Sequence, residues 1–277
     1  MIEQKSVKFT FAVVFCISVL SAILSYFQIP YQLYIWEIFI DAKVIALALF
    51  VFFLYKRKTL QFPKIKVLLL TWSWKRNIFY FFFPLFLYLI AIIAGLLVKE
   101  VSLNKLDNAI TLVLATLFDI PAIFVFSSTS ILIEEIFFRG IILSTIQGQY
   151  SQLKSIVVAN ILWIVYSVSE IIGIKELNLL KFISVAIYFL SMGIMCSVLK
   201  NKYQSIWFGY SLRVGVITLT PIIISSLISE SDSFFVSNSL LFVAEGIAVS
   251  CLFLLCSVQL FKSSQMVLET PQENLES

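Results

Sequence analysis

The feature that most constrains this chain is a series of apolar runs, each long enough to cross a membrane. A transmembrane helix needs about 20 consecutive apolar residues. The sequence offers eight such runs, near residues 9–29, 34–55, 78–98, 109–147, 155–174, 182–199, 205–228 and 235–261. Apolar residues make up 60% of the chain and charged residues only 13%, about half the usual share of a soluble domain. The sequence therefore predicts an all-α fold, a polytopic helical bundle of about eight transmembrane helices in the cell membrane.

The spacing of these runs leaves no room for a separate soluble domain. We predict a single transmembrane helical domain over residues 1–262 and a disordered cytoplasmic tail over residues 263–277, which are polar and acidic. Membrane lipid is the partner that this composition implies, and nothing in the sequence indicates binding to nucleic acid.

The orientation follows from the lysines and arginines of the short loops, which are enriched on the cytoplasmic side. With the N-terminus inside, 14 of the 20 cations fall in inner segments and four in outer ones, while Lys43 and Arg213 lie within spans. This distribution predicts that both termini are cytoplasmic.

The run at 109–147 is longer than one crossing requires, since its 39 residues would form a helix of about 58 Å. Splitting it into two crossings would reverse every later segment and violate the charge distribution. We therefore expect one crossing, bent near Asp119-Ile120-Pro121, because proline removes a backbone hydrogen bond.

Three charged residues, Glu134, Glu135 and Arg139, interrupt the same apolar run. Insertion of a charge into a bilayer costs roughly 2.5–3.5 kcal/mol, so such groups usually mark a function or a specific buried pairing. Glu135 and Arg139 are four residues apart and can pair on one helix face, whereas Glu134 is rotated by about 100°. The pattern allows two interpretations: a general base beside a structural partner, or a buried salt-bridge cluster that holds the bundle together.

The segment Glu134-Glu135-Ile-Phe-Phe-Arg139-Gly140 resembles the first motif, Glu-Glu-x-x-x-Arg, of the CAAX protease and bacteriocin-processing enzyme family, also called the Abi proteins. That family consists of eight-helix intramembrane endopeptidases. The resemblance implies that Glu134 activates a water molecule, that Arg139 braces Glu135, and that histidines and an asparagine from later helices complete the site.

The later motifs of the family are present only in part, and the resemblance covers roughly residues 109–220. The second motif, Phe-x-x-x-His, is best matched by Trp163-Ile-Val-Tyr-Ser167, with serine in place of histidine. Gln204-Ser205-Ile206-Trp207 matches the lead-in to the third motif, but its histidine position falls on Arg213 and its asparagine position on Ile217. The chain contains no histidine at all. Candidate catalytic positions are therefore Glu134, Glu135, Arg139, Ser167 and Arg213.

Two function classes follow. Peptide hydrolysis needs a base for the water and a donor for the oxyanion, and histidine supplies both. Its absence favours a catalytically impaired or non-catalytic member, acting in bacteriocin self-immunity in a bacterium or regulating a membrane protein or peptide partner. The alternative is an active endopeptidase that cleaves membrane-associated or leader-bearing peptides with Glu134, in which Glu170 and Asn160 partly replace the missing groups. A transporter is a third and much less favoured function class, because the sequence contains no regularly spaced acidic relay and no convincing inverted repeat.

No cofactor or metal is expected. Zinc sites draw on clustered histidine and cysteine, and the four cysteines, Cys16, Cys196, Cys251 and Cys256, lie separately within apolar runs. These cysteines are predicted to be reduced packing residues.

Overall fold

The computed structural model of the chain describes chiefly residues 71–97, 128–172, 179–227 and 247–269. Shorter described stretches are 12–13, 15–17, 19, 32–35, 38–41, 45–47, 49–50 and 52. The predicted bend at Asp119–Pro121 lies outside the described residues.

The described part of the chain is a helical bundle, as the sequence predicted. The helices are α4 (Trp74–Leu97), a π-helix η1 (Glu135–Ile142) continued by α6 (Leu143–Gln147), then α7 (Gln152–Ile172), α8 (Leu179–Tyr203), α9 (Trp207–Leu227) and α11 (Ile247–Glu269). Residues 128–134 are helical and lead directly into η1. The first seven residues of the predicted tail, 263–269, belong to α11.

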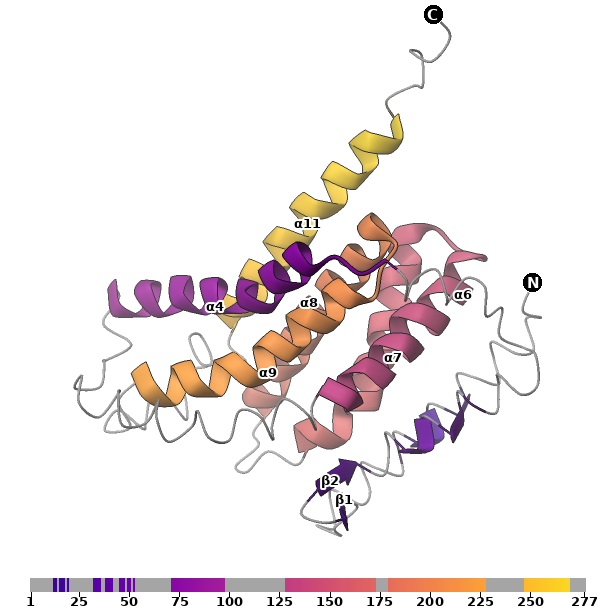
Figure 1. The fold of residues 1–277 in the computed structure, drawn as a ribbon, viewed down its shortest axis with the longest axis horizontal. Coiled ribbons are helices and arrows are strands. Elements are labelled where there is room, and N and C mark those ends of the chain that lie inside the picture. Colours follow the sequence, from indigo (N-terminus) through magenta and orange to yellow (C-terminus); the bar gives the residue numbers. More distant parts are fainter. Residues whose placement is uncertain are drawn as a thin grey trace, which may run out of the picture.

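Helix α8 lies at the centre of this bundle and packs against α7, α9 and α11. Figure 1 shows α4 crossing over α9, and these two helices form the largest interhelical contact. Gly215 of α9 makes the close approach possible, because a Cβ atom there would lie 2.0 Å from the carbonyl oxygen of Phe81. Small residues at helix contacts are typical of membrane bundles.

The outer faces of the helices are apolar. On α4 the exposed large side chains recur at helical spacing: Ile78, Phe79, Phe82, Phe86, Leu89, Ile93 and Leu97. Leu153, Val157 and Ile161 form a second stripe along α7. Exposed apolar stripes of this length suit helices whose solvent is lipid.

Two of the described helices, Trp74–Leu97 and Phe182–Tyr203, are long and apolar enough to cross a membrane, with mean hydropathies of 2.4 and 2.2. Gln152–Ser167 and Ala248–Ser263 are shorter apolar helices. Tryptophans gather where α4 and α9 begin: the Trp72 ring lies 5.1 Å from Trp74 and 4.7 Å from Trp207. Tryptophan is enriched at membrane–water interfaces, so this end of both helices has the character of such a boundary.

One predicted helix is partly wrong. The expected span at 34–55 begins instead within an antiparallel hairpin, in which β1 (Gln32–Ile35) pairs with β2 (Ile38–Asp41) and Gln32 lies opposite Asp41. The segment is rich in isoleucine, tyrosine and phenylalanine, which favour strands. Apolar content alone did not distinguish this strand-forming run from a helix.

Candidate functional site

The motif Glu-Glu-x-x-x-Arg lies on an unusual helix. Residues 135–142 form a π-helix between two α-helical segments, and Glu134 is its N-terminal flanking residue. A π-helix is rare, and short π segments within α-helices frequently occur at functional sites. Because a π-helix has a wider turn than an α-helix, a sequence argument based on 100° per residue holds only approximately in this segment.

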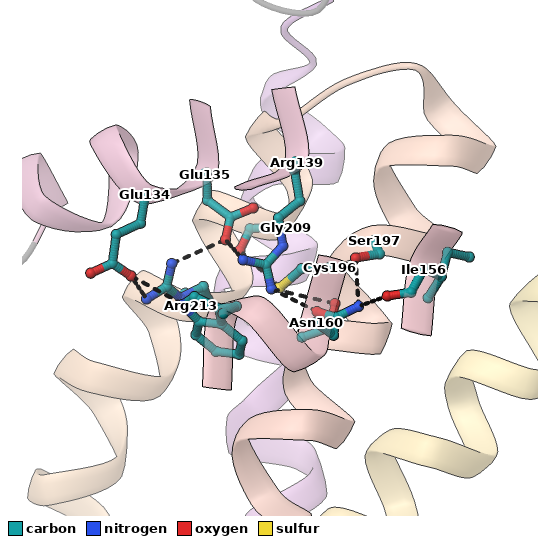
Figure 2. A network of polar contacts seen from close by, with 11 residues as sticks. Glu134, Glu135, Arg139, Ile156, Asn160, Cys196, Ser197, Gly209 and Arg213 are labelled. Atoms are coloured by element: carbon teal, nitrogen blue, oxygen red, sulfur yellow. Dashed lines mark hydrogen bonds and ion pairs between the residues drawn. The ribbon is translucent and has the colours of Figure 1, made fainter. Parts of the chain in front are cut away.

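Four charged side chains meet inside the bundle, and we call Glu134, Glu135, Arg139 and Arg213 the charged quartet (Figure 2). Arg213 of α9 contacts both glutamates: Nη2 lies 2.5 Å from Glu134 Oε2, and Nη1 lies 3.1 Å from Glu135 Oε1. Arg139 Nη1 lies 3.5 Å from the same Glu135 oxygen. Two carboxylates therefore face two guanidinium groups, and the formal charges cancel.

The quartet is almost completely shielded from solvent. Glu135 and Arg139 are 0% and 1% exposed, and Glu134 and Arg213 are 5% and 6% exposed. Removing charges from water is expensive, and only close pairing with further hydrogen bonds offsets that cost. Neighbours on α7 and α8 supply such hydrogen bonds to Arg139 and Glu134, while Glu135 Oε2 and the Nε atoms of both arginines are buried without one among the described residues.

Trp163 of α7 contacts both arginines. Its ring centroid lies 4.4 Å from Arg139 Cζ and 4.7 Å from Arg213 Cζ, within the range of cation–π attraction. Its indole Nε1 also donates to Glu134 Oε2 over 3.4 Å. The residue that the sequence identified as the aromatic of the second motif thus contacts three of the four charges.

Asn160, one turn before Trp163, orients Arg139. Arg139 Nη2 donates to Asn160 Oδ1 at 3.2 Å and to the Gly193 carbonyl at 3.4 Å. The Asn160 amide donates in turn to the Ile156 carbonyl and to Ser197 Oγ. Arg139 therefore braces Glu135 while it is itself held by α7 and α8.

Two glycines allow α8 and α9 to approach this cluster, and sequence analysis did not single them out. A Cβ atom on Gly193 would lie 2.3 Å from Asn160 Oδ1 and 2.7 Å from a Trp163 ring carbon. A Cβ atom on Gly209 would lie 3.0 Å from Glu135 Oε2. An isolated glycine in an apolar helical run is the signal that could have indicated such close contacts.

The other positions that the sequence singled out are not part of the charged quartet. Ser167 is buried, but in the described part of the chain no hydrogen bond joins it to the quartet, whereas Arg213 contacts both glutamates. Ile217, at the position of the family asparagine, is 37% exposed. The side chain of Glu170 lies outside the described residues.

The contacts of Arg213 limit the chemistry that Glu134 can perform. A general base must accept a proton from water at a carboxylate oxygen that water can reach. Glu134 Oε2 instead accepts from both Arg213 and Trp163, and the carboxyl group is nearly enclosed. This geometry suits a stable ion-pair cluster better than the activation of a water molecule.

Comparison with protein families gives a match over part of the chain. Residues 112–216 match the model of the type II CAAX prenyl endopeptidase Rce1-like family. This segment is Rce1-like. No curated protein and no solved structure matches the chain. The resemblance inferred from the motifs is therefore confirmed over this segment, and the match together with the apolar helices indicates a membrane protein.

The Rce1-like segment contains all five candidate positions, from Glu134 to Arg213. Four of them form the quartet, and three of those four belong to the first motif. The fourth, Arg213, occupies the position at which the motif comparison expects histidine, so the member of the cluster that departs from the family is also the one that neutralises its excess negative charge.

Proposed function

We propose that this protein is a non-catalytic CAAX-protease-like membrane protein that binds a membrane-protein or peptide partner without cleaving it. In this proposal the quartet is an inherited framework that fixes the bundle. The partner is bound in the membrane, and its recognition serves bacteriocin self-immunity or the regulation of another membrane protein.

The observation that carries this proposal is the contact of Arg213 with both glutamates, at 2.5 Å and 3.1 Å. A histidine at this position could give or take a proton near neutral pH. Arginine stays charged and cannot perform that exchange. With Arg213 in place, Glu134 is held as an ion-pair partner.

Ser167 supports the same conclusion. Serine can donate or accept a hydrogen bond but does not titrate in the useful range, and the chain contains no histidine. An oxyanion donor and a proton donor to the leaving amine would therefore have to come from residues other than histidine, and Ser167 can supply only the hydrogen bond.

We further propose that the whole chain crosses the membrane about eight times with both termini in the cytoplasm. The support is the excess of lysine and arginine in alternate loops and the tryptophan cluster at the start of α4 and α9, where a membrane boundary is expected.

The proposal is tested with purified protein and two readouts, cleavage and binding. A fluorescent prenylated CAAX peptide and a leader-bearing peptide are incubated with wild-type protein and with Glu134→Gln, which keeps the shape of the side chain but cannot act as a base. We expect no cleavage above the no-protein control for either protein.

In parallel, Glu134→Gln is compared with wild type for complementation of the phenotype produced by deleting the gene, with protein levels checked by membrane blot. Full function at normal levels supports a binding role. Cleavage by wild type that Glu134→Gln abolishes, together with loss of complementation at normal levels, would establish the endopeptidase instead.

A further inference from the structure

A second buried cation lies outside the quartet, near the end of α8. Lys200 is only 4% exposed. Its Nζ atom donates one hydrogen bond, to Gln147 Oε1 at 3.1 Å. Among the residues that the structure describes, no carboxylate forms an ion pair with it. An ammonium group has three donors and no acceptor, so two donors of Lys200 have no protein partner there.

The neighbouring amides add to this surplus of donors. Gln147 Nε2 donates to Asn201 Oδ1 at 2.9 Å, which uses the acceptor of Asn201. The Nδ2 atom of Asn201 is buried and makes no hydrogen bond with any residue that the structure describes. Lys200, Gln147 and Asn201, which we call the Lys200 cluster, therefore offer donors and a positive charge without a matching acceptor.

The position of the cluster indicates which anion it meets. Gln147 ends α6 and is followed by an exposed turn, residues 148–151, while α8 ends three residues after Lys200 at Tyr203. The cluster thus lies where apolar helix gives way to exposed polar chain. In a membrane protein that depth is occupied by lipid headgroups, and lysine is a common phosphate ligand.

We propose that the Lys200 cluster is a binding site for a phosphate group at the membrane surface, supplied by the headgroup of an anionic phospholipid. The Lys200 ammonium contacts a phosphate oxygen, and the Asn201 amide donates to a second one. This site is separate from the charged quartet and does not depend on whether the protein cleaves or binds its partner.

The experiment measures lipid binding by native mass spectrometry on full-length protein in detergent, titrated with phosphatidylglycerol or phosphatidylcholine. We expect tighter binding of phosphatidylglycerol by wild type and roughly tenfold weaker binding after Lys200→Met, the loss expected for one charge-assisted hydrogen bond. Lys154→Met is the matched control, because Lys154 is exposed beside the same turn and lies over the Tyr150 ring.

A second variant distinguishes the loss of the binding site from the loss of the fold. Gln147→Glu places a carboxylate oxygen at the position now 3.1 Å from Lys200 Nζ, so the ammonium gains an internal partner. We expect this variant to unfold at a higher temperature than wild type and to bind phosphatidylglycerol less tightly. Unchanged lipid binding in Lys200→Met and Gln147→Glu, or an equal loss in Lys154→Met, overturns the proposal.

Inorganic phosphate distinguishes the two sources of the anion. If the lipid is the ligand, millimolar phosphate leaves the bound phosphatidylglycerol in place. If phosphate displaces the lipid from wild type and binds Lys200→Met less well, the site still recognises phosphate but takes it from solution.

Discussion

The bundle buries charge in two places and balances it in two different ways. In the quartet, two carboxylates face two guanidinium groups within 3.5 Å, and Trp163 and Asn160 hold them in position. In the Lys200 cluster, an ammonium group that forms no ion pair with the described residues donates one hydrogen bond to an amide oxygen. The first arrangement balances its formal charge within the protein, whereas in our proposal the second gains its balance from a ligand.

This difference explains why the two sites should respond oppositely to neutral substitutions. Breaking a buried pair leaves an uncompensated charge and is strongly destabilising, but removing a charge that has no partner costs little. Unfolding measurements in lipid-free detergent compare the two sites directly.

The largest effect is expected from Arg213→Met, which leaves Glu134 and Glu135 with Arg139 as their nearest cation. We expect a loss of about 3–5 kcal/mol in the free energy of unfolding, the cost of leaving a buried charge uncompensated. Ile217→Ala, on the exposed face of the same helix, serves as control and should cost less than about 1 kcal/mol. A loss in Arg213→Met no greater than that of the control would show that the quartet is not a stabilising unit.

Gly193→Ala should come next, since a Cβ atom would lie 2.3 Å from Asn160 Oδ1 and 2.7 Å from the Trp163 ring. Both side chains hold the quartet, so we expect about 1–3 kcal/mol of overpacking cost. Gly140→Ala is the matched control, because its nearest neighbour would be at 3.9 Å. Equal stability of the two variants would contradict the close contact of α7 and α8.

Trp163→Phe sharpens the description of the quartet by removing the indole donor and weakening two cation–π contacts. We expect a loss of about 1–2 kcal/mol in the unfolding free energy. Trp74→Phe, at a side chain that is 71% exposed, should change it by less than about 0.5 kcal/mol. If both variants unfold alike, Trp163 contributes packing without the polar contacts.

Lys200→Met should have the smallest effect of the four on the protein itself. Because Lys200 has no ion-pair partner in the described part of the chain, we expect the unfolding free energy without lipid to change by less than about 1 kcal/mol, or to rise. Added phosphatidylglycerol should then stabilise wild type more than the variant. A loss as large as that of Arg213→Met would mean that Lys200 has a structural partner.

Much of the bundle could be predicted from the sequence because lipid imposes a simple length rule. The expected spans at 78–98, 155–174, 182–199 and 205–228 correspond to α4, α7, α8 and α9 within a few residues. The hairpin at residues 32–41 could not be predicted in this way, because the rule measures how apolar a run is and ignores its preference for strand.

The site was predictable where its contacts are local. The spacing of Glu135 and Arg139 predicted their pairing, and they lie 3.5 Å apart. The contact of Glu134 with Arg213 joins residues 79 positions apart, on different helices. Sequence spacing could therefore not predict it. The π-helix and the close approaches at Gly193 and Gly209 depend on tertiary packing in the same way.

The most direct test of the central claim is a double-mutant cycle of Glu134→Gln and Arg213→Met, measured by unfolding. If Arg213 serves as the counter-ion of the glutamates, the double variant, which keeps the charge balanced, should be more stable than Arg213→Met alone, with a coupling of about 1–3 kcal/mol. Additive losses with no coupling would contradict the account and leave Glu134 available for another role.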